Sequence, residues 1–431
     1  MDPYGELYRN FRWDVPEFFN FGTAIDALAA EPDQTALLWE DHEGNRARLT
    51  FADIREQSNR IANVLVGLGV RRGDRVIVAL GRVTLWQAAY VGTLKAGAIV
   101  VPCGTALGEK DIVERAHHTG ASAIIATVKN AELIGDLRNR CSTLRHYLIT
   151  GSPRPGWQGL HASMLKASPD FTPVRARAAD SAICCYSCGT TSAPKAILHS
   201  HAYTWCLRHL ASQWLDVRPG ELHWTTFETD EAEAAYGSLF GPWMNSAPIF
   251  MYGGPVDPQK ELALLARYPI ATLCASPTEY LIMLERDSGG GLRALRHCTS
   301  AGEPLDGETF AAWRDRFGLR IHEGYGQAET ALAVANLPGM EVRPGSMGRP
   351  FPGYDVRILD AEGREASDGE TGELAIRVRP ERPPPLFLHY WKDAEKSAAA
   401  FHGDHYFTGD RASRDADGYL WFAGRGDAPA K

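Results

Sequence analysis

The chain has 431 residues, with 45 Lys or Arg against 53 Asp or Glu, and a formal net charge of -8 at pH 7. Its 44% hydrophobic and 23% charged residues are typical of a globular protein and exclude a disordered or fibrous chain. The lack of a basic stripe argues against a nucleic-acid partner, and the lack of a run of about 18 apolar residues argues against a membrane span.

The first part of the chain alternates helical segments with short apolar runs. Thr50 and Asp53 form a capping pair at the start of an amphipathic helix that we expect over residues 50–70. The next runs and helical segments lie at 75–80, 84–97, 98–103, 109–120 and 122–127. Because apolar runs that alternate with helices are typical of parallel βαβ units, we predict that residues 1–180 form an α/β subdomain.

The same alternation resumes beyond residue 180 and then changes character. Apolar runs and helices follow one another at 181–187, 201–215, 247–252, 258–268 and 270–276. They predict a second α/β subdomain over residues 181–335. From residue 336, short runs between Gly, Pro and Asp-Gly turns predict a β-rich portion over 336–431. The predicted fold class is α/β, with two doubly wound βαβ subdomains followed by a β-barrel-like subdomain.

A hydroxyl-rich turn follows the apolar run at 181–187. The stretch CCYSCGTTSAPKAILH (184–199) contains Gly189, Thr190, Thr191 and Lys195. Hydroxyl and ammonium groups around a glycine suit polyphosphate oxygens, and loops at the carboxyl edge of a parallel sheet bind ligands. The stretch is not a Walker A loop, because Pro194 and Ala196 replace its last glycine and its Mg²⁺-binding hydroxyl. From these residues alone, a phosphate site and a solvated turn are both open.

The cysteines argue against zinc and against a secreted fold. Cys185 and Cys188 form one C-x-x-C, but no second Cys or His pair follows at the spacing of a four-ligand zinc site. Eight cysteines without dense spacing predict reduced thiols. Because the N-terminal stretch MDPYGELYRNFRW also lacks the pattern of a signal peptide, we expect a cytoplasmic protein.

Two further clusters contain groups suited to a nucleotide. HEGYGQAET (322–330) offers the ring of Tyr325 for a purine and the carboxylate of Glu329 for Mg²⁺. YFTGD (406–410) ends in Asp410, whose carboxylate could accept hydrogen bonds from a ribose diol. Each cluster alone also fits an ordinary turn.

In this order, the three clusters resemble the adenylate-forming superfamily of acyl-CoA synthetases, luciferases and peptide-synthetase adenylation domains. The stretches LKAGAIVVP, SPTEYL, CTSAGEPL, RPGSMGRPFPGYDV, GELAIR and GRGD extend the resemblance over nearly the whole chain. EGYGQAETALAVAN and DADGYLWFAGRGD look most like the medium-chain acyl-CoA synthetase branch. The resemblance implies that a carboxylic acid and ATP give an acyl-adenylate and pyrophosphate, and that coenzyme A then takes the acyl group.

The resemblance also implies roles for individual residues. Catalytic roles fall to Thr190, Lys195 and Glu329, with Glu329 as the Mg²⁺ ligand. The ATP-binding residues would be Thr191, Gly302, Glu303, Pro304, Tyr325, Gly326, Gln327, Asp410 and Arg425. The acid pocket would include Glu228, Glu231, Tyr236, Ser300 and Ala301. The implied partners are a small carboxylic acid and, as acyl acceptor, coenzyme A or a carrier protein, and a homodimer is an open alternative.

The chain departs from the family pattern in the phosphate loop. Ser187, Cys188, Ser192 and Ala196 replace the usual Thr, Ser, Gly and Gly. Ala328 replaces a threonine, and the loss of one hydrogen bond to a charged group would slow adenylation by roughly ten- to a hundredfold. Two alternatives to the ligase therefore stay open: a relative that uses ready-made acyl-adenylates, and an inactive binding protein of the same fold.

The acid pocket and the end of the chain also differ from the pattern. A family stretch ending in Asp-x-Gly-Trp reads Glu228, Thr229, Asp230, Glu231 here, so we hypothesise that Glu228 or Glu231 faces a polar or amine-bearing acid. The alternative is a solvated helix face. The stretch GRGDAPAK resembles the hinge before a mobile domain of about 100 residues, which we expect to be absent here. We therefore expect poor unaided thioester formation, and a role in secondary metabolism.

Overall fold

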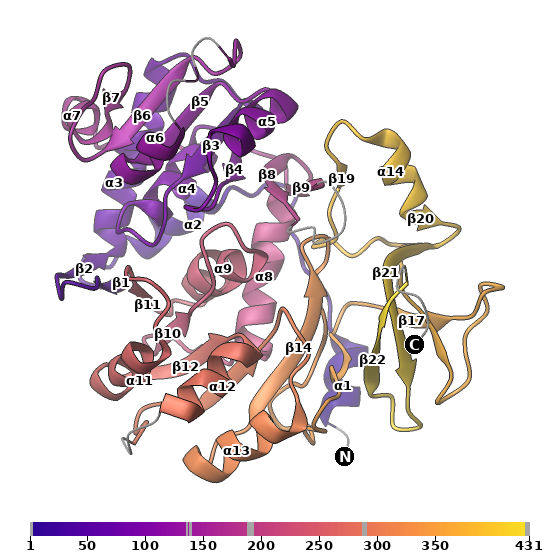
Figure 1. Ribbon diagram of the computed structural model, residues 1–431. Coiled ribbons are helices and arrows are strands. Elements are labelled where there is room, and N and C mark those ends of the chain that lie inside the picture. Colours follow the sequence, from indigo (N-terminus) through magenta and orange to yellow (C-terminus); the bar gives the residue numbers. More distant parts are fainter. Residues whose placement is uncertain (1–2, 135–136, 138–139, 188–193, 287–290, 427–431) are drawn as a thin grey trace.

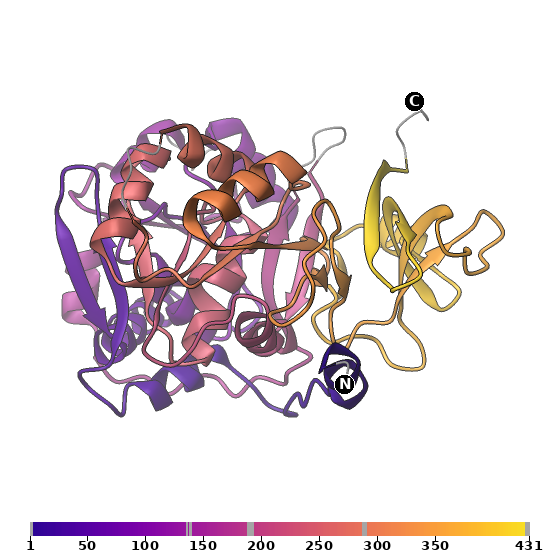
Figure 2. The ribbon, with the colours of Figure 1, turned by 90° about the horizontal axis from the view of Figure 1, so that it is seen from below.

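Three β-sheets and the helices that cover them make up the described fold (Figure 1). The computed structural model describes residues 3–134, 137, 140–187, 194–286 and 291–426. The two larger sheets lie against each other, and the C-terminal sheet stands to one side of them (Figure 2). The predicted α/β fold class with a β-rich third portion is confirmed.

The first sheet has eight strands in the order β19-β9-β8-β4-β3-β5-β6-β7. Its strands are β3 (Arg75–Ala79), β4 (Ile99–Pro102), β5 (Ala123–Thr127), β6 (His146–Thr150), β7 (Gln158–Gly159), β8 (Ser181–Tyr186), β9 (Ala196–Ser200) and β19 (His389–Tyr390). The helices before and between them are α3 (Phe51–Gly67), α4 (Trp86–Lys95), α5 (Glu109–Thr119), α6 (Val128–Ile134) and α7 (Leu160–Lys166). Strands β4, β3, β5 and β6 run parallel, as their nearly continuous apolar sequences predict.

The helix predicted over residues 50–70 begins with the expected capping box. The Thr50 hydroxyl accepts a hydrogen bond from the Asp53 N–H, and the Asp53 carboxylate accepts one from the Thr50 N–H at 2.8 Å. These bonds satisfy backbone donors that a helix start leaves without partners. The helix, α3, ends three residues earlier than predicted, at Gly67.

The second sheet has nine strands in the order β16-β15-β14-β13-β12-β10-β11-β1-β2. They are β1 (Thr35–Glu40), β2 (Arg46–Thr50), β10 (Leu222–Thr225), β11 (Ile249–Tyr252), β12 (Ile270–Ala275), β13 (His297–Ser300), β14 (Ile321–Gln327), β15 (Ala331–Ala335) and β16 (Arg349–Pro350). Its helices are α8 (His201–Gln213), α9 (Ala232–Ala235), the π-helix η1 (Tyr236–Phe240), α10 (Gly241–Met244), α11 (Pro258–Arg267), α12 (Pro277–Arg286) and α13 (Gly307–Phe317).

The third sheet is antiparallel and follows the order β17-β18-β21-β20, with β22 beside β21. Its elements are β17 (Val356–Leu359), β18 (Thr371–Arg377), α14 (Ala394–Ala399), β20 (Phe401–His402), β21 (His405–Arg414) and β22 (Leu420–Arg425). Helix α1 (Pro3–Asn10) comes to this end of the molecule (Figure 2), and α2 (Phe21–Leu28) packs against α3 and α4. Hydrogen bonds at 2.8 and 2.7 Å tie Tyr4 and Tyr8 of α1 to the backbone at Pro350 and Tyr354.

The two large sheets exchange strands across residue 180, where we predicted a boundary. Strands β1 and β2 precede it but belong to the second sheet, whereas β8 and β9 follow it but belong to the first. Strand β1 pairs in parallel with β11, about 200 residues away, which local pattern cannot reveal. The two sheets also share one hydrophobic core, in which Val78 of β3 and Ile249 of β11 are both buried.

No helix in the described ranges is long and apolar enough to cross a membrane. Helix α4 is buried along its whole length, including Lys95. The Lys95 ammonium donates hydrogen bonds at 2.6 Å to Asp26 and to Asn59, so its charge is paired inside the protein.

Candidate active site

Most predicted site residues lie where strands of the second sheet end. Strands β13 and β14 run parallel, so their carboxyl ends meet at one edge. The loop Gly302–Glu303–Pro304 follows β13 and is exposed, and Gly302 has a φ of +91°, which favours glycine. Tyr325, Gly326 and Gln327 form the end of β14, so the structure brings two predicted groups to the same edge.

Lys195 and Glu329 both lie next to a tyrosine that sequence reasoning missed, Tyr390 of β19. The Tyr390 hydroxyl donates a hydrogen bond to Glu329 Oε1 at 2.8 Å, and Lys195 Nζ lies 5.2 Å from the centre of the Tyr390 ring. Glu329 is only 7% exposed. Burial raises the pKa of Glu329, while the Tyr390 hydroxyl and the Lys195 charge offset part of that rise.

A second cluster joins β14 to the third sheet through Asp410. Asp410 Oδ2 accepts hydrogen bonds from the Tyr325 hydroxyl at 2.6 Å and from Gln327 Nε2 at 2.8 Å. Gln327 Oε1 in turn accepts a hydrogen bond from the Tyr406 hydroxyl at 3.0 Å. Asp410 is 8% exposed, so its carboxylate sits in a mostly closed network of donors. Arg425, on β22, stands opposite Asp410 in the strand register and is exposed.

The described residues on the two sides of the phosphate loop are hydrogen-bonded to each other. The Ser187 N–H donates to the Lys195 carbonyl at 3.0 Å, and the Lys195 N–H donates to the Ser187 hydroxyl at 3.1 Å. Strands β8 and β9 on the two sides of the loop are antiparallel neighbours. The predicted residues Thr190 and Thr191 lie outside the described residues. Lys195 is thus the predicted loop residue that the structure places beside Glu329.

The two glutamates predicted for the acid pocket have partners inside the protein. Glu228 forms an ion pair with Arg82 at 2.8 Å, and Glu231 accepts a hydrogen bond from the Glu228 N–H at 2.7 Å. Burial raises the pKa of Glu231 to about 7, although the Glu228 N–H lowers it. Neither residue stands on a solvated helix face, since Glu231 immediately precedes the four-residue helix α9.

The other predicted pocket residues are buried around the same strand ends. Tyr236 begins the π-helix η1 and is 3% exposed. Ser300 and Ala301 are also buried, but the Ser300 hydroxyl already donates to the Ala275 carbonyl at 2.9 Å. Ser300 therefore has its hydrogen bond within the sheet and is not a free donor toward a ligand.

The residues that sequence reasoning missed are Tyr390, Tyr406 and Arg82. A signal for Tyr406 was present, because residues 406, 408 and 410 alternate along β21, and alternate residues of a strand share a face. Tyr390 has no such local signal, since it meets Glu329 only through the pairing of β19 with β9.

The described residues contain no group of three or more His, Cys, Asp or Glu side chains that could hold a metal. The cysteines in these ranges are all free. Burial raises the pKa of the Cys185 thiol, so it stays protonated and does not suit a metal. Glu329 is the carboxylate that fits a cation here, because it is buried next to a loop predicted to bind phosphate.

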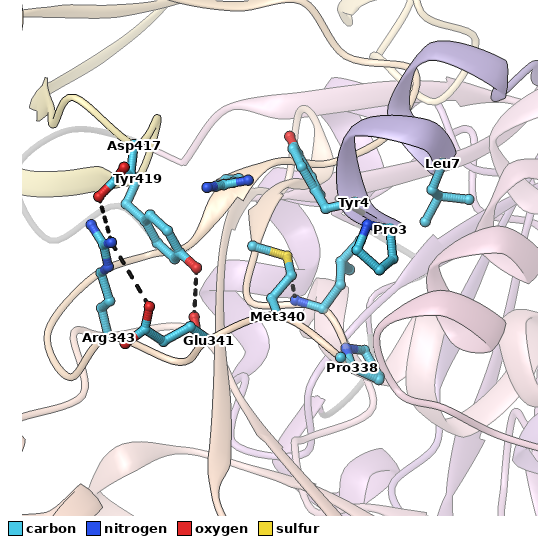
Figure 3. Close-up of a pocket in the computed structure, with 12 residues that line it drawn as sticks. Pro3, Tyr4, Leu7, Pro338, Met340, Glu341, Arg343, Asp417 and Tyr419 are labelled. Carbon is cyan, nitrogen blue, oxygen red and sulfur yellow. Dashed lines mark hydrogen bonds and ion pairs between the residues drawn. The ribbon is translucent and has the colours of Figure 1, made fainter. Parts of the chain in front are cut away.

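A separate pocket lies between α1 and the C-terminal sheet (Figure 3). It has a volume of about 360 Å³ and is lined by residues that include Tyr4, Met340 and Tyr419. Arg343 at its wall pairs with Asp415 at 2.7 Å. None of the predicted site residues lines this pocket, so it is distinct from the candidate active site.

Comparisons with known proteins find relatives that are similar over nearly the whole chain. Residues 25–382 match the family model described as AMP-binding enzyme. Acyl-coenzyme A synthetase ACSM3, mitochondrial, from Homo sapiens is 35% identical over 436 residues, which cover 98% of this chain and 74% of that protein. Acyl-coenzyme A synthetase ACSM5, mitochondrial, from Mus musculus is 35% identical over 429 residues, covering 96% of this chain and 74% of that protein.

Two solved structures are similar over nearly the whole chain. An acyl-CoA synthetase from Brucella canis superposes with a TM-score of 0.91 at 26% identity, covering 99% of this chain and 80% of that one. The anthranilate CoA ligase AuaEII, in complex with anthranoyl-AMP, superposes with a TM-score of 0.90 at 28% identity, covering 98% of this chain and 81% of that one.

Proposed function

The chain belongs to the AMP-binding enzyme family, and we propose that it activates a carboxylic acid with ATP to an acyl-adenylate, the first half of an AMP-forming acid:CoA ligase reaction. The observation that carries this proposal is the meeting of Lys195, Glu329 and the Asp410 cluster at one sheet edge. The Lys195 ammonium and the buried carboxylates of Glu329 and Asp410 occur together there, next to the predicted phosphate loop.

The nucleotide would bind along this edge. Tyr325 and the loop Gly302–Pro304 would flank the adenine, and Asp410 and Arg425 would hold the ribose hydroxyls. Lys195, together with the hydroxyls of Thr190 and Thr191, would bind the phosphates. The short hydrogen bonds that Asp410 accepts from Tyr325 and Gln327 support this role, because they hold its carboxylate in one orientation before ATP arrives.

Glu329 is our proposed ligand for Mg²⁺. Magnesium keeps several water ligands and is usually bound by one or two carboxylates together with substrate phosphates, so one buried carboxylate beside a phosphate loop suits it. The ion would neutralise charge on the phosphates. The Tyr390 hydroxyl holds Glu329 in place, and this hydrogen bond and the Lys195 charge both lower the pKa that burial has raised, which favours the ionised carboxylate.

The reaction needs positioning and charge neutralisation more than a protein nucleophile. A carboxylate oxygen of the acid attacks the α-phosphorus of ATP, a new P–O bond forms, and the bond to pyrophosphate breaks. Lys195 would stabilise the negative charge that moves onto the leaving pyrophosphate. No proton is transferred in this step if the acid binds as a carboxylate.

The departures from the family pattern favour a second candidate, an enzyme that accepts ready-made acyl-adenylates. Ala328 provides no hydroxyl toward the α-phosphate, and its carbonyl accepts a hydrogen bond from His199 at 2.7 Å. Adenylation would then be slow while binding of the acyl-adenylate persists. The third candidate is an inactive binding protein of the same fold.

The acyl acceptor and the setting of the reaction are further proposals. We propose coenzyme A as the acceptor, as the names of the relatives support, with a carrier protein as the alternative. Free, buried cysteines suit a reducing compartment, and we propose the cytoplasm, although the relatives named above are mitochondrial. A homodimer stays a prediction.

Exchange of labelled pyrophosphate into ATP tests the proposed function. With a panel of carboxylic acids and Mg²⁺, the wild-type protein should catalyse exchange that depends on at least one acid. Binding of an acyl-adenylate without exchange would favour the second candidate. Neither exchange nor binding would leave only the inactive binding protein.

A further inference from the structure

The N-terminal segment, residues 3–14, packs against the linker between the second and third sheets. The linker is formed by residues 351–355, between the end of β16 and the start of β17. Helix α1, which makes up most of the segment, lies where the larger sheets meet the C-terminal sheet (Figure 2). The Trp13 indole N–H donates a hydrogen bond to the Gly353 carbonyl at 3.1 Å. A Cβ atom at Gly353 would lie 2.5 Å from the Trp13 ring, so the linker has a glycine where the ring comes close.

The end of the segment is fixed to helix α8. Asp14 has a φ of +43°, which is uncommon for a residue other than glycine. Its carboxylate pairs with Arg208 of α8 at 2.6 Å and accepts a hydrogen bond from Nε2 of His209 at 3.1 Å. The ring centres of Phe11 and His209 are 5.0 Å apart. The segment therefore has a second anchor, on α8, that holds Trp13 against the linker.

Tyr354 of the linker contacts the turn that carries Glu329. Tyr354 is only 1% exposed, and its hydroxyl donates a hydrogen bond to the Thr330 carbonyl. Thr330 follows Glu329 directly, and the Thr330 hydroxyl accepts a hydrogen bond from the Gln327 N–H at 2.9 Å. The turn between β14 and β15, with two of the proposed site residues, is therefore bonded to the linker.

The N-terminal segment contacts both the backbone and the ring of Tyr354. The Tyr8 hydroxyl donates a hydrogen bond to the Tyr354 carbonyl at 2.7 Å. The rings of Trp13 and Tyr354 pack edge to face, with their centres 5.6 Å apart and their planes at 85°. Tyr8 and Trp13 both precede residues 25–382, the span that matches the family model. Contacts from outside that span therefore fix a residue that is bonded to the site.

We propose that Trp13 and Tyr354 are positioning residues, which hold the turn of Gln327 and Glu329 in the geometry that binds ATP and Mg²⁺. The proposal rests on the proposed function of this site. Trp13 acts on the turn through Tyr354, and Tyr354 acts through its hydrogen bond to Thr330. A displacement of about 1 Å in a site can slow a reaction about a hundredfold, so packing that fixes the turn is worth measuring as ATP binding.

Variants of the two residues test the proposal through the KM for ATP in acid-dependent pyrophosphate exchange. Trp13→Ala and Tyr354→Phe should each raise this KM about tenfold, because each breaks the same chain of contacts to the turn. The KM for the acid should stay at its wild-type value. Trp13→Phe keeps a ring but loses the N–H, so it should raise the KM for ATP less than Trp13→Ala does. The double variant of Trp13→Ala and Tyr354→Phe should show no more than the larger single effect, whereas independent effects would multiply.

Trp157→Ala is the matched control. Trp157 also packs edge to face against a tyrosine, Tyr147, with ring centres 5.4 Å apart. It directly precedes β7, which lies at the other end of the first sheet from β9, so its KM for ATP should equal that of the wild type.

Three results would overturn the proposal and leave the proposed function standing. They are an unchanged KM for ATP in Tyr354→Phe, an equal rise in the KM values for ATP and for the acid, and single effects that multiply in the double variant. No exchange by the wild type with any acid would instead contradict the proposed function, and the proposal with it.

Discussion

The nucleotide side and the acid side of the candidate site differ in how their charged groups are satisfied. On the nucleotide side, Asp410 and Glu329 both accept hydrogen bonds from tyrosines. On the acid side, Glu228 forms an ion pair with Arg82, and Glu231 accepts a hydrogen bond from the Glu228 N–H. The neutral tyrosine donors leave the negative charges of Asp410 and Glu329 available to a ligand, whereas the Arg82 charge neutralises that of Glu228.

The largest expected effect concerns the charge on the nucleotide side. Lys195→Ala should lower acid-dependent pyrophosphate exchange about 10² to 10³-fold, because a positioned charge that stabilises the leaving phosphates is lost. Lys110→Ala is the control, since the Lys110 side chain is 84% exposed and lies on α5, outside the candidate site. Similar exchange rates for the two variants would contradict the proposed role of Lys195.

A smaller effect is expected where Asp410 is held in place. Tyr325→Phe removes one hydrogen bond to a carboxylate, so the KM for ATP should rise about tenfold. Tyr419→Phe also removes one tyrosine hydrogen bond, to the Glu341 carbonyl at 2.7 Å, but outside the site. Steady-state kinetics should show a raised KM only in the first variant, and equal values in both would contradict the ribose assignment.

The pH dependence of activity tests the surroundings of Glu329. The Tyr390 hydroxyl lowers the pKa of Glu329, which burial raises, so Tyr390→Phe should raise that pKa further. Because Mg²⁺ needs the ionised carboxylate, the acid limb of the pH profile of kcat/KM should move to higher pH. An acid limb that stays in place, or moves to lower pH, would contradict the proposal that Glu329 binds Mg²⁺.

The smallest effect on activity, but a measurable one on stability, is expected away from the site. Burial, with the Glu279 charge, raises the pKa of Glu261 from 4.5 to about 8. Between these values the unfolded chain is ionised while the folded one holds the proton, so stability falls as pH rises through this window. Glu261→Gln should therefore stabilise the protein by about 1 to 3 kcal/mol at pH 8 and little at pH 4.5.

Chemical denaturation at the two pH values measures this difference. Glu285→Gln is the control, because Glu285 is exposed. A Glu261→Gln variant that gains no stability at pH 8 would mean that the folded protein holds Glu261 ionised.

Local patterns predicted many of the helices and strands, because those features depend on near neighbours, whereas the roles on the nucleotide side came from the family resemblance and stay predictions. The Thr50 and Asp53 capping box is an example, contained within a few residues. Long-range strand pairing could not be predicted from local patterns. The pairing of β19, for example, brings Tyr390 into contact with Glu329, which is 61 residues away in the chain. The exchange of β1 and β8 between sheets has the same cause.

The partners of the two predicted acid-pocket glutamates could not be predicted from the sequence. Glu228 is bound by Arg82, which lies 146 residues earlier in the chain. Helix α9 has four residues and passes directly into a π-helix, so no regular period predicts which glutamate faces inward. That Glu228 or Glu231 faces a polar or amine-bearing acid stays a prediction.

Pyrophosphate exchange by the wild-type protein, measured with Mg²⁺ and a panel of carboxylic acids, tests the account of the site most directly. A nucleotide side that binds ATP beside an acid pocket predicts exchange that depends on at least one of the acids. No exchange with any acid would contradict this account of the site.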